Sequence, residues 1–196
     1  MAGRSRPLPF AAGTPQELEA AVRERCLTLL SHQPRTRAEL ERSLSRAGAP
    51  DDVAAAVLDR LTQVGLVDDT AYAEAYVRTG VGVRRRGTRS LRAELRTRGV
   101  DPEVIDLAAA QVDDQDERAT ALALASRRAP GLARLAPEAQ RRRLMGLLLR
   151  RGFSGAVVSE VVAQVLAGLA SDDDDGGGFG LLDEEDLDGA EVLSEG

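Results

Sequence analysis

Apolar side chains recur at intervals of three and four residues from Gln16 to Ala170, which is the period of an α-helix. No useful stretch alternates apolar and polar residues in the way a half-buried β-strand does. The pattern therefore predicts an all-α fold. Three of the expected helices lie at roughly 18–31, 70–78 and 117–128.

One spacing of apolar residues occurs three times without gaps: two leucines four apart, a glycine four later, then a valine five later. The copies are Leu40-Leu44-Gly48-Val53, Leu91-Leu95-Gly99-Val104 and Leu144-Leu148-Gly152-Val157. The leucine pair lies on one helix face, and the glycine can adopt the positive φ that ends a helix. A new helix then begins about two residues later, best seen in the run Asp101-Pro102-Glu103.

Each copy, with the helix before it, makes a three-helix module of about 50 residues. A module this small is marginally stable alone, so we expect neighbours to stack and share apolar faces. The result is an elongated, curved array of three tandem three-helix repeats. We expect a flexible N-terminal arm (1–15), repeat 1 (16–67), repeat 2 (68–113), repeat 3 (114–170) and a disordered acidic tail (171–196).

Charge is distributed unevenly along the chain. The whole chain has 26 basic residues, all of them Arg, and 32 acidic residues, for a formal charge of −6. Residues 171–196 hold seven Asp, four Glu and no Arg, a composition that cannot bury enough apolar surface to fold. Residues 1–170 keep 21 acids against all 26 arginines and so carry +5. The helical body is therefore suited to an anionic partner.

The densest basic stretch lies in the second repeat and holds seven arginines against one glutamate. Its candidate binding residues are Arg84, Arg85, Arg86, Arg89, Arg92 and Arg96. The last three lie within about 60° of one another on a helix, away from the leucine seam. The run 84–86 falls in a loop or first turn, where neighbouring glycines give freedom. We interpret the stretch as a surface for a polyanion or an acidic protein, and a solvated helix face is the alternative.

A second basic cluster brackets the apolar run 144–149 in the third repeat. Arg143 and Arg150 are seven residues apart and share a helix face, so they are secondary candidates. A buried helix with charged ends is the alternative interpretation.

Two pairs of residues at the start of the second repeat have structural and functional interpretations. Tyr72 and Tyr76 are expected to pack on a helix face, and base stacking is the alternative. Asp68 and Asp69 are expected to cap that helix rather than to bind a metal. Aromatic residues make up only 3% of the chain, so binding is expected to be electrostatic.

The chain offers little for catalysis or cofactor binding. Its single cysteine, Cys26, is expected in the core, and its single histidine, His32, at a helix end. The glycines at 80, 82 and 87 lack the residues of a phosphate loop and are interpreted as a hinge. We expect no catalytic residue, metal or cofactor. No signal-peptide core or run of 18 apolar residues is present, which favours a cytoplasmic protein without a membrane partner.

Three segments together resemble the RecX family of recombinase regulators over about residues 17–167. The central one is Leu66-Val-Asp-Asp-x2-Tyr72-Ala-x2-Tyr76-Val-Arg78, continued by Gly87-x3-Leu91-x2-Glu94-Leu95-x3-Gly99-Val100. The flanking ones are Pro34-Arg35-x2-Ala38-Glu39-Leu40 and Leu148-x-Arg150-Arg151-Gly152-Phe153. The family's frequent Pro-x-Gly before the second helix is replaced here by Arg85-Arg86-Gly87, and the acidic tail lies outside the family pattern.

The resemblance implies a non-enzymatic, all-helical protein that binds RecA recombinase filaments on single-stranded DNA, directly or through RecA. It implies inhibition of recombination and modulation of DNA repair and the DNA-damage (SOS) response. We expect a monomer. The alternative is a stand-alone helical DNA-binding module, which three equivalent helix pairs disfavour. The tail could fold back on the arginines and compete with anionic partners.

Overall fold

The computed structural model describes residue 10 and residues 14–174, and within these it contains helices and no strand. The all-α prediction is confirmed. In chain order the helices are α1 (Pro15–His32), α2 (Arg37–Arg46), α3 (Asp51–Gln63), α4 (Asp69–Gly82), α5 (Thr88–Arg98), α6 (Pro102–Ala110), α7 (Asp114–Arg128), the 3-10 helix η1 (Ala129–Leu132), α8 (Pro137–Arg150) and α9 (Gly155–Asp174).

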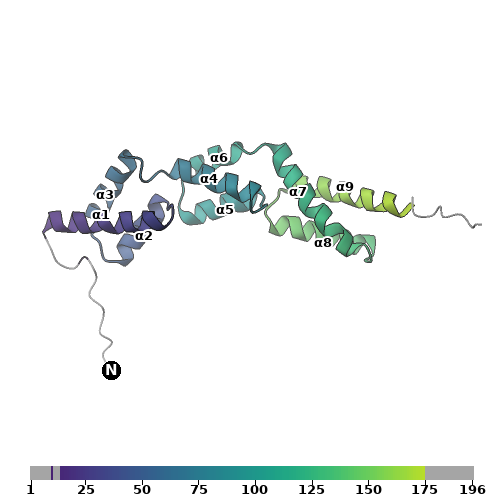
Figure 1. Cartoon of the computed structure of the whole chain (residues 1–196), viewed down its shortest axis with the longest axis horizontal. Coiled ribbons are helices and arrows are strands. Elements are labelled where there is room, and N and C mark those ends of the chain that lie inside the picture. Colours follow the sequence, from purple (N-terminus) through teal and green to yellow (C-terminus); the bar gives the residue numbers. More distant parts are fainter. Residues whose placement is uncertain (1–9, 11–13, 175–196) are drawn as a thin grey trace, which may run out of the picture.

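The helices form three groups, α1–α3, α4–α6 and α7–α9, which follow one another along an elongated body. In Figure 1 the middle group lies at the top of a shallow arch. The predicted array of three tandem three-helix repeats is thus confirmed, while the exact boundaries at 16–67, 68–113 and 114–170 stay a prediction.

Each repeat has its own hydrophobic core. The largest buried side chains are Leu40, Leu44 and Leu58 in the first repeat, Leu91, Leu95 and Ile105 in the second, and Leu144, Leu148 and Phe153 in the third. These clusters are separate, so the expectation that neighbouring repeats share apolar faces is wrong. Polar residues at helix ends instead make the hydrogen bonds between repeats. Thr36 and Glu117, the two buried polar residues of the described chain, both lie at these junctions.

The repeated glycines end their helices as predicted. Gly48, Gly99 and Gly152 have φ of 82°, 86° and 85°. In each case the next N–H donates to the carbonyl five residues earlier: Ala49 to Leu44 at 3.1 Å, Val100 to Leu95 at 3.1 Å and Phe153 to Leu148 at 3.2 Å. This is the Schellman arrangement, and the residue after each glycine is buried.

The middle helices of the three repeats meet end to end. The Thr36 hydroxyl, at the start of α2, donates to the carbonyl oxygen of Arg98 at the end of α5 (2.8 Å). At the start of α5, the Gly87 N–H and the Ser90 hydroxyl donate to the carbonyl oxygen of Arg151 after α8 (2.9 and 3.1 Å). Each contact brings the positive N-terminal end of one helix to the negative C-terminal end of the next. Helices α8, α5 and α2 therefore form one row.

A carboxylate from the following repeat completes each junction. Asp69 of α4 accepts from the N–H of Arg37, the first residue of α2, at 2.8 Å. Glu117 of α7 accepts from the N–H of Thr88, the first residue of α5, at 3.0 Å. Burial raises the pKa of Asp69, although the hydrogen bond from Arg37 opposes this. Each carboxylate thus accepts a hydrogen bond from the first N–H of a middle helix, α2 or α5, at equivalent positions in the two junctions.

Of the three glycines interpreted as a hinge, Gly80 and Gly87 instead allow close packing, while Gly82 has open space around it. A side chain on Gly87 would overlap the backbone of Gly152 and Phe153. A side chain on Gly80 would overlap Leu91. Here glycine is needed because two pieces of backbone, or a helix and a leucine, approach each other directly.

The two ends of the array extend slightly beyond the predicted body. Phe10 is buried against the first core, and α1 begins at Pro15 after a cap by Thr14. Helix α9 continues to Asp174. The rest of the predicted arm, and the predicted acidic tail from residue 175 onward, lie outside the described residues.

Candidate polyanion-binding surface

Helix α5 presents two unpaired arginines from the predicted stripe. It buries Leu91 and Leu95 against the second core, which turns Arg89 and Arg96 outward. Both side chains are exposed, and no ion pair within the described part of the chain involves either. Their full charge is therefore available to a partner.

Two other predicted arginines are already neutralised within the second repeat. Arg92 pairs with Asp106 of α6. Arg86 pairs with Glu94 of α5, whose carboxylate also accepts from the Tyr76 hydroxyl. These two arginines contribute less net charge to the surface than spacing alone suggested.

The loop that carries Arg84, Arg85 and Arg86 is fixed by backbone hydrogen bonds. The Arg84 N–H donates to the Thr79 carbonyl (3.1 Å), and the Arg86 N–H donates to the Gly80 carbonyl (3.0 Å). Arg85 has a φ of 50°, a left-handed conformation that costs a non-glycine residue about 1 kcal/mol. The loop is therefore held in place, rather than free to adapt as the sequence suggested.

Helix α8 carries the remaining predicted arginines on its open surface. Arg143 and Arg150 are exposed, and among the described residues neither makes an ion pair. Leu144 and Leu148 are buried, but Leu149 is 45% exposed. The apolar run is therefore exposed on one side, and a binding role for Arg143 and Arg150 stays a prediction.

Tyr72 and Tyr76 combine core packing with an open ring surface. Their rings stack with centroids 5.9 Å apart and 16° between planes, and they pack against the second core as predicted. Both remain half-buried. The guanidinium carbons of Arg84 and Arg98 lie 5.9 and 5.1 Å from the Tyr76 ring centroid, within the range of cation–π contacts.

Two arginines that join the first and second repeats were not among the binding residues predicted from the sequence. Arg98 pairs with Glu39 of α2 at 2.6 Å. Arg42 of α2 donates to the carbonyl oxygen of Arg98 at 2.9 Å, and so places a cation at the C-terminal end of α5. Arg98 belongs to the predicted basic run, but Arg42 and Glu39 lie more than 55 residues away from it along the chain, beyond any local spacing.

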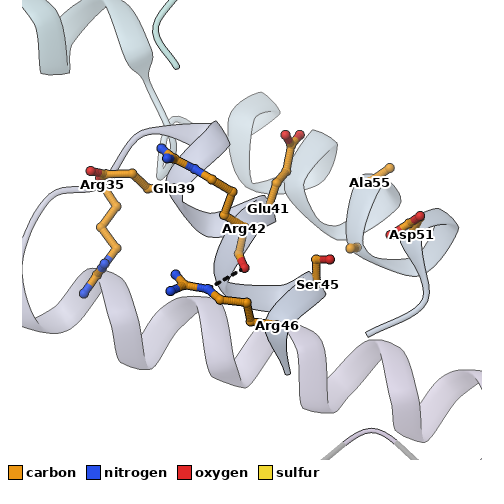
Figure 2. A pocket seen from close by; sticks show the side chains of 9 residues that line it. Arg35, Glu39, Glu41, Arg42, Ser45, Arg46, Asp51 and Ala55 are labelled. Atoms are coloured by element: carbon orange, nitrogen blue, oxygen red, sulfur yellow. Dashed lines mark hydrogen bonds between the residues drawn. The ribbon is translucent and has the colours of Figure 1, made fainter. Parts of the chain in front are cut away.

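A cavity of about 830 Å³ beside α2 has balanced charge (Figure 2). Its charged lining consists of Arg35, Arg42, Arg46, Glu39, Glu41 and Asp51. Figure 2 shows the Arg46 side chain bonded to the Arg42 carbonyl, at 3.0 Å. With three cations and three anions, this cavity adds no net charge to the surface.

The other candidate residues have structural roles. The Asp68 carboxylate accepts from the Ala71 N–H at 2.9 Å, which confirms capping by Asp68, whereas Asp69 accepts from the Arg37 N–H at the start of α2 instead. No cluster suited to a metal ion occurs in the described part. Cys26 is buried, which raises its thiol pKa, and His32 is exposed at the end of α1, both as predicted. Of the described helices, none combines the length and apolarity needed to cross a membrane.

Three family profiles match the chain in the order of its repeats. The first three-helix domain of RecX matches residues 23–61, the second matches 68–108 and the third matches 115–162. Each match falls within one of the three helical groups, so family and structure divide the chain in the same order.

Similar proteins extend this match over most of the chain. The regulatory protein RecX of Thermobifida fusca is 42% identical over 164 residues, which cover 84% of this chain and 88% of that protein. That of Mycolicibacterium vanbaalenii is 46% identical over 172 residues, covering 82% and 94%. The crystal structure of RecX from Lactobacillus salivarius superposes with a TM-score of 0.72 at 23% identity, over 76% of this chain and 97% of that one. At that identity it supports the fold alone.

Proposed function

Because this chain belongs to the RecX family of regulatory proteins, we propose that it is a non-enzymatic inhibitor of the RecA recombinase. It binds RecA filaments on single-stranded DNA, in the cytoplasm and as a monomer. There it restrains recombination and modulates DNA repair and the SOS response.

The observation that carries this proposal is the set of exposed arginines without ion pairs on consecutive repeats. Arg89 and Arg96 on α5 and Arg143 and Arg150 on α8 lie on helices that meet end to end. An elongated body with charge distributed along its length can contact several subunits of a filament at once. Charge-assisted contacts to carboxylates or phosphates then supply orientation and association rate, and they weaken as salt rises.

RecA-catalysed strand exchange, with and without the full-length protein, tests the proposal. The sharpest variant is Arg89→Glu with Arg96→Glu, because neither side chain has a structural partner in the described chain. The matched control is Arg25→Glu with Arg134→Glu, which changes the charge equally at exposed positions outside the proposed surface. We leave Arg92 unchanged, because a glutamate there would repel Asp106.

We expect the wild-type protein and the control to inhibit strand exchange, and the α5 variant to inhibit at least tenfold less well per mole. No inhibition by the wild-type protein at a level stoichiometric with RecA would refute the proposed function. Equal inhibition by both double variants would exclude the α5 surface. Tight, sequence-selective duplex binding in a gel shift without RecA would favour the stand-alone DNA-binding module.

A further inference from the structure

A cavity of about 640 Å³ lies at the junction between the first and second repeats. Residues from both repeats line it, among them Arg35, Tyr72, Tyr76, Arg84 and Arg98. These come from the connection between α1 and α2, from α4, from the loop after α4 and from the end of α5. The cavity is distinct from the exposed arginines of α5 and α8.

Positive charge dominates the lining of this cavity. Arg98 is paired with Glu39, whereas Arg84 makes no ion pair among the described residues. The Nε atom of Arg35 is buried and has no hydrogen-bond partner within the described structure. Figure 2 shows the Arg35 side chain turned toward α1, away from the carboxylate of Glu39. A buried guanidinium nitrogen without an acceptor is costly, and Arg35 also makes no ion pair within the described structure, so its charge is available to an anion.

Acidic groups offset this charge only in part. The cavity lining includes one carboxylate, that of Asp68, and this group is already engaged by the Ala71 N–H at the start of α4. Because Glu39 neutralises Arg98, two guanidinium groups, those of Arg35 and Arg84, face one carboxylate.

The cavity also has a flat aromatic and apolar side. Tyr72 and Tyr76 are parallel, half-buried, and both line the space. Leu30 and Leu66 add apolar surface, and Leu66 is 52% exposed. A planar ring can pack here, while guanidinium groups a short distance away bind an anion.

We propose that this cavity binds a nucleoside phosphate, with its base against Tyr72 and its phosphate held by Arg35 and Arg84. The volume is that of an ordinary small-molecule site. Parallel tyrosine rings favour a base over the flexible side chains of an acidic peptide. The ligand can be a free nucleotide or one nucleotide of a single strand, since the recognised chemistry is the same. The inference does not depend on the proposed action on RecA.

The chain has two tyrosines and no tryptophan, so its intrinsic fluorescence comes entirely from this cavity. The full-length protein is titrated with uridine monophosphate and with single-stranded oligo(dT), at two salt concentrations and with correction for absorbance. We expect saturable quenching of tyrosine emission, weaker at higher salt for the oligonucleotide. If the mononucleotide competes with a labelled oligonucleotide and binds as tightly, the ligand is a free nucleotide. If the oligonucleotide binds far more tightly, it is a strand.

Two variants and a control locate the binding. Tyr72→Leu keeps apolar packing but removes the ring, and Arg84→Gln changes an exposed side chain in the loop. Arg134→Gln removes the same charge from an exposed position in the third repeat. We expect each cavity variant to lower the affinity for labelled oligo(dT) about tenfold, and the control less than twofold. Circular dichroism checks that each variant is folded. If Tyr72→Leu does not fold, the comparison of Arg84→Gln with Arg134→Gln still tests the inference.

Three results would overturn the inference. The first is that neither the oligonucleotide nor the mononucleotide changes tyrosine emission. The second is that Arg84→Gln loses no more affinity for the oligonucleotide than Arg134→Gln does. The third is that a glutamate-rich peptide displaces the oligonucleotide at equal concentration. Strand exchange is scored separately on the same variants. If a variant loses RecA inhibition but its tyrosine emission is quenched normally, the nucleotide-binding cavity stands. If a variant loses quenching but still inhibits RecA, the proposed function stands.

Discussion

At the junction between the second and third repeats, the close packing around Gly87 predicts that a larger residue there separates the two repeats. A methyl group at this position would overlap the backbone of Gly152 and Phe153, and a backbone cannot move aside as a side chain does. Gly87→Ala should therefore separate the start of α5 from the end of α8, while both repeats keep their own cores.

The cost follows from the hydrogen bonds that this separation breaks. Those from the Gly87 N–H and the Ser90 hydroxyl to the Arg151 carbonyl are lost, and those from Thr88 to Glu117 are lengthened or lost. Each neutral bond contributes about 1 kcal/mol, and those to the charged Glu117 somewhat more. Gly87→Ala should thus weaken the coupling between repeats by about 2–4 kcal/mol, a large part of the stability of a small domain.

Two optical probes can detect this uncoupling during urea denaturation. Tyrosine fluorescence reports on the second repeat alone, and far-ultraviolet circular dichroism reports on every helix. In the wild-type protein we expect the two transitions to coincide. In Gly87→Ala they should separate, because the repeats then unfold with their own stabilities. The same experiment tests the predicted repeat boundaries.

Gly168→Ala is the matched control. Gly168 lies inside α9, and no atom lies near the position of an added methyl group. Alanine there should stabilise the helix by up to about 1 kcal/mol and leave the two probes coincident. If Gly87→Ala unfolds with coincident probes and an unchanged midpoint, the close backbone approach does not couple the repeats, and the reasoning fails.

Three further predictions concern separate features. Arg85→Gly should raise the free energy of unfolding by about 1 kcal/mol in urea titrations, because glycine relieves the left-handed conformation; a lower value would show that the arginine side chain stabilises the loop. Because burial raises the pKa of Asp69, the folded state binds this proton more tightly than the unfolded chain does. Stability therefore falls as pH rises from about 4 through the folded pKa, and Asp69→Asn, measured by thermal melts across this range, should remove that part of the pH dependence. Truncation after Asp174 removes eight carboxylates and should raise affinity for single-stranded DNA in anisotropy titrations at low salt, whereas unchanged affinity would refute competition by the tail.

Local features of the fold could be predicted because short stretches of sequence determine them. Gly99 lies four residues after Leu95, where a glycine can end α5. Its positive φ and the hydrogen bonds around it are those expected from this spacing. Asp101 likewise caps α6 by accepting from the N–H of Glu103, two residues later. In such cases each residue and its partner lie within one helical turn.

The junctions could not be predicted because their partners lie far apart in sequence and their chemistry is that of helix ends. Thr36 is the N-cap of α2, a local role, and its hydroxyl also donates to the Arg98 carbonyl in the next repeat. Gly87 looked like a flexible residue, yet it is required by Gly152. The apolar pattern correctly identified the residues in the core of each repeat. By itself it wrongly suggested that neighbouring repeats share one apolar core.

The same separation limited the prediction of the binding surface. Helical periodicity correctly turned Arg89 and Arg96 outward, but it could not show that Asp106 neutralises Arg92. Nor could it bring Arg35 to the tyrosines of α4, since these residues belong to different repeats. Charge counting along one helix gives the number of arginines, and tertiary pairing decides which of them remain available.

Separate cores joined at helix ends have a mechanical consequence for the proposed binding along a filament. Bending at a junction leaves each hydrophobic core packed, and a hydrogen bond tolerates small rotations that a close-packed core does not. We therefore expect any bending of the array to occur at the junctions, where the hydrogen bonds and the close backbone contact at Gly87 resist it, rather than within the cores. Arg96 and Arg143 lie on opposite sides of one such junction, so the junction controls whether both can contact the same partner. Under the proposed function, the geometry of this junction therefore sets the spacing between the exposed arginines of α5 and those of α8.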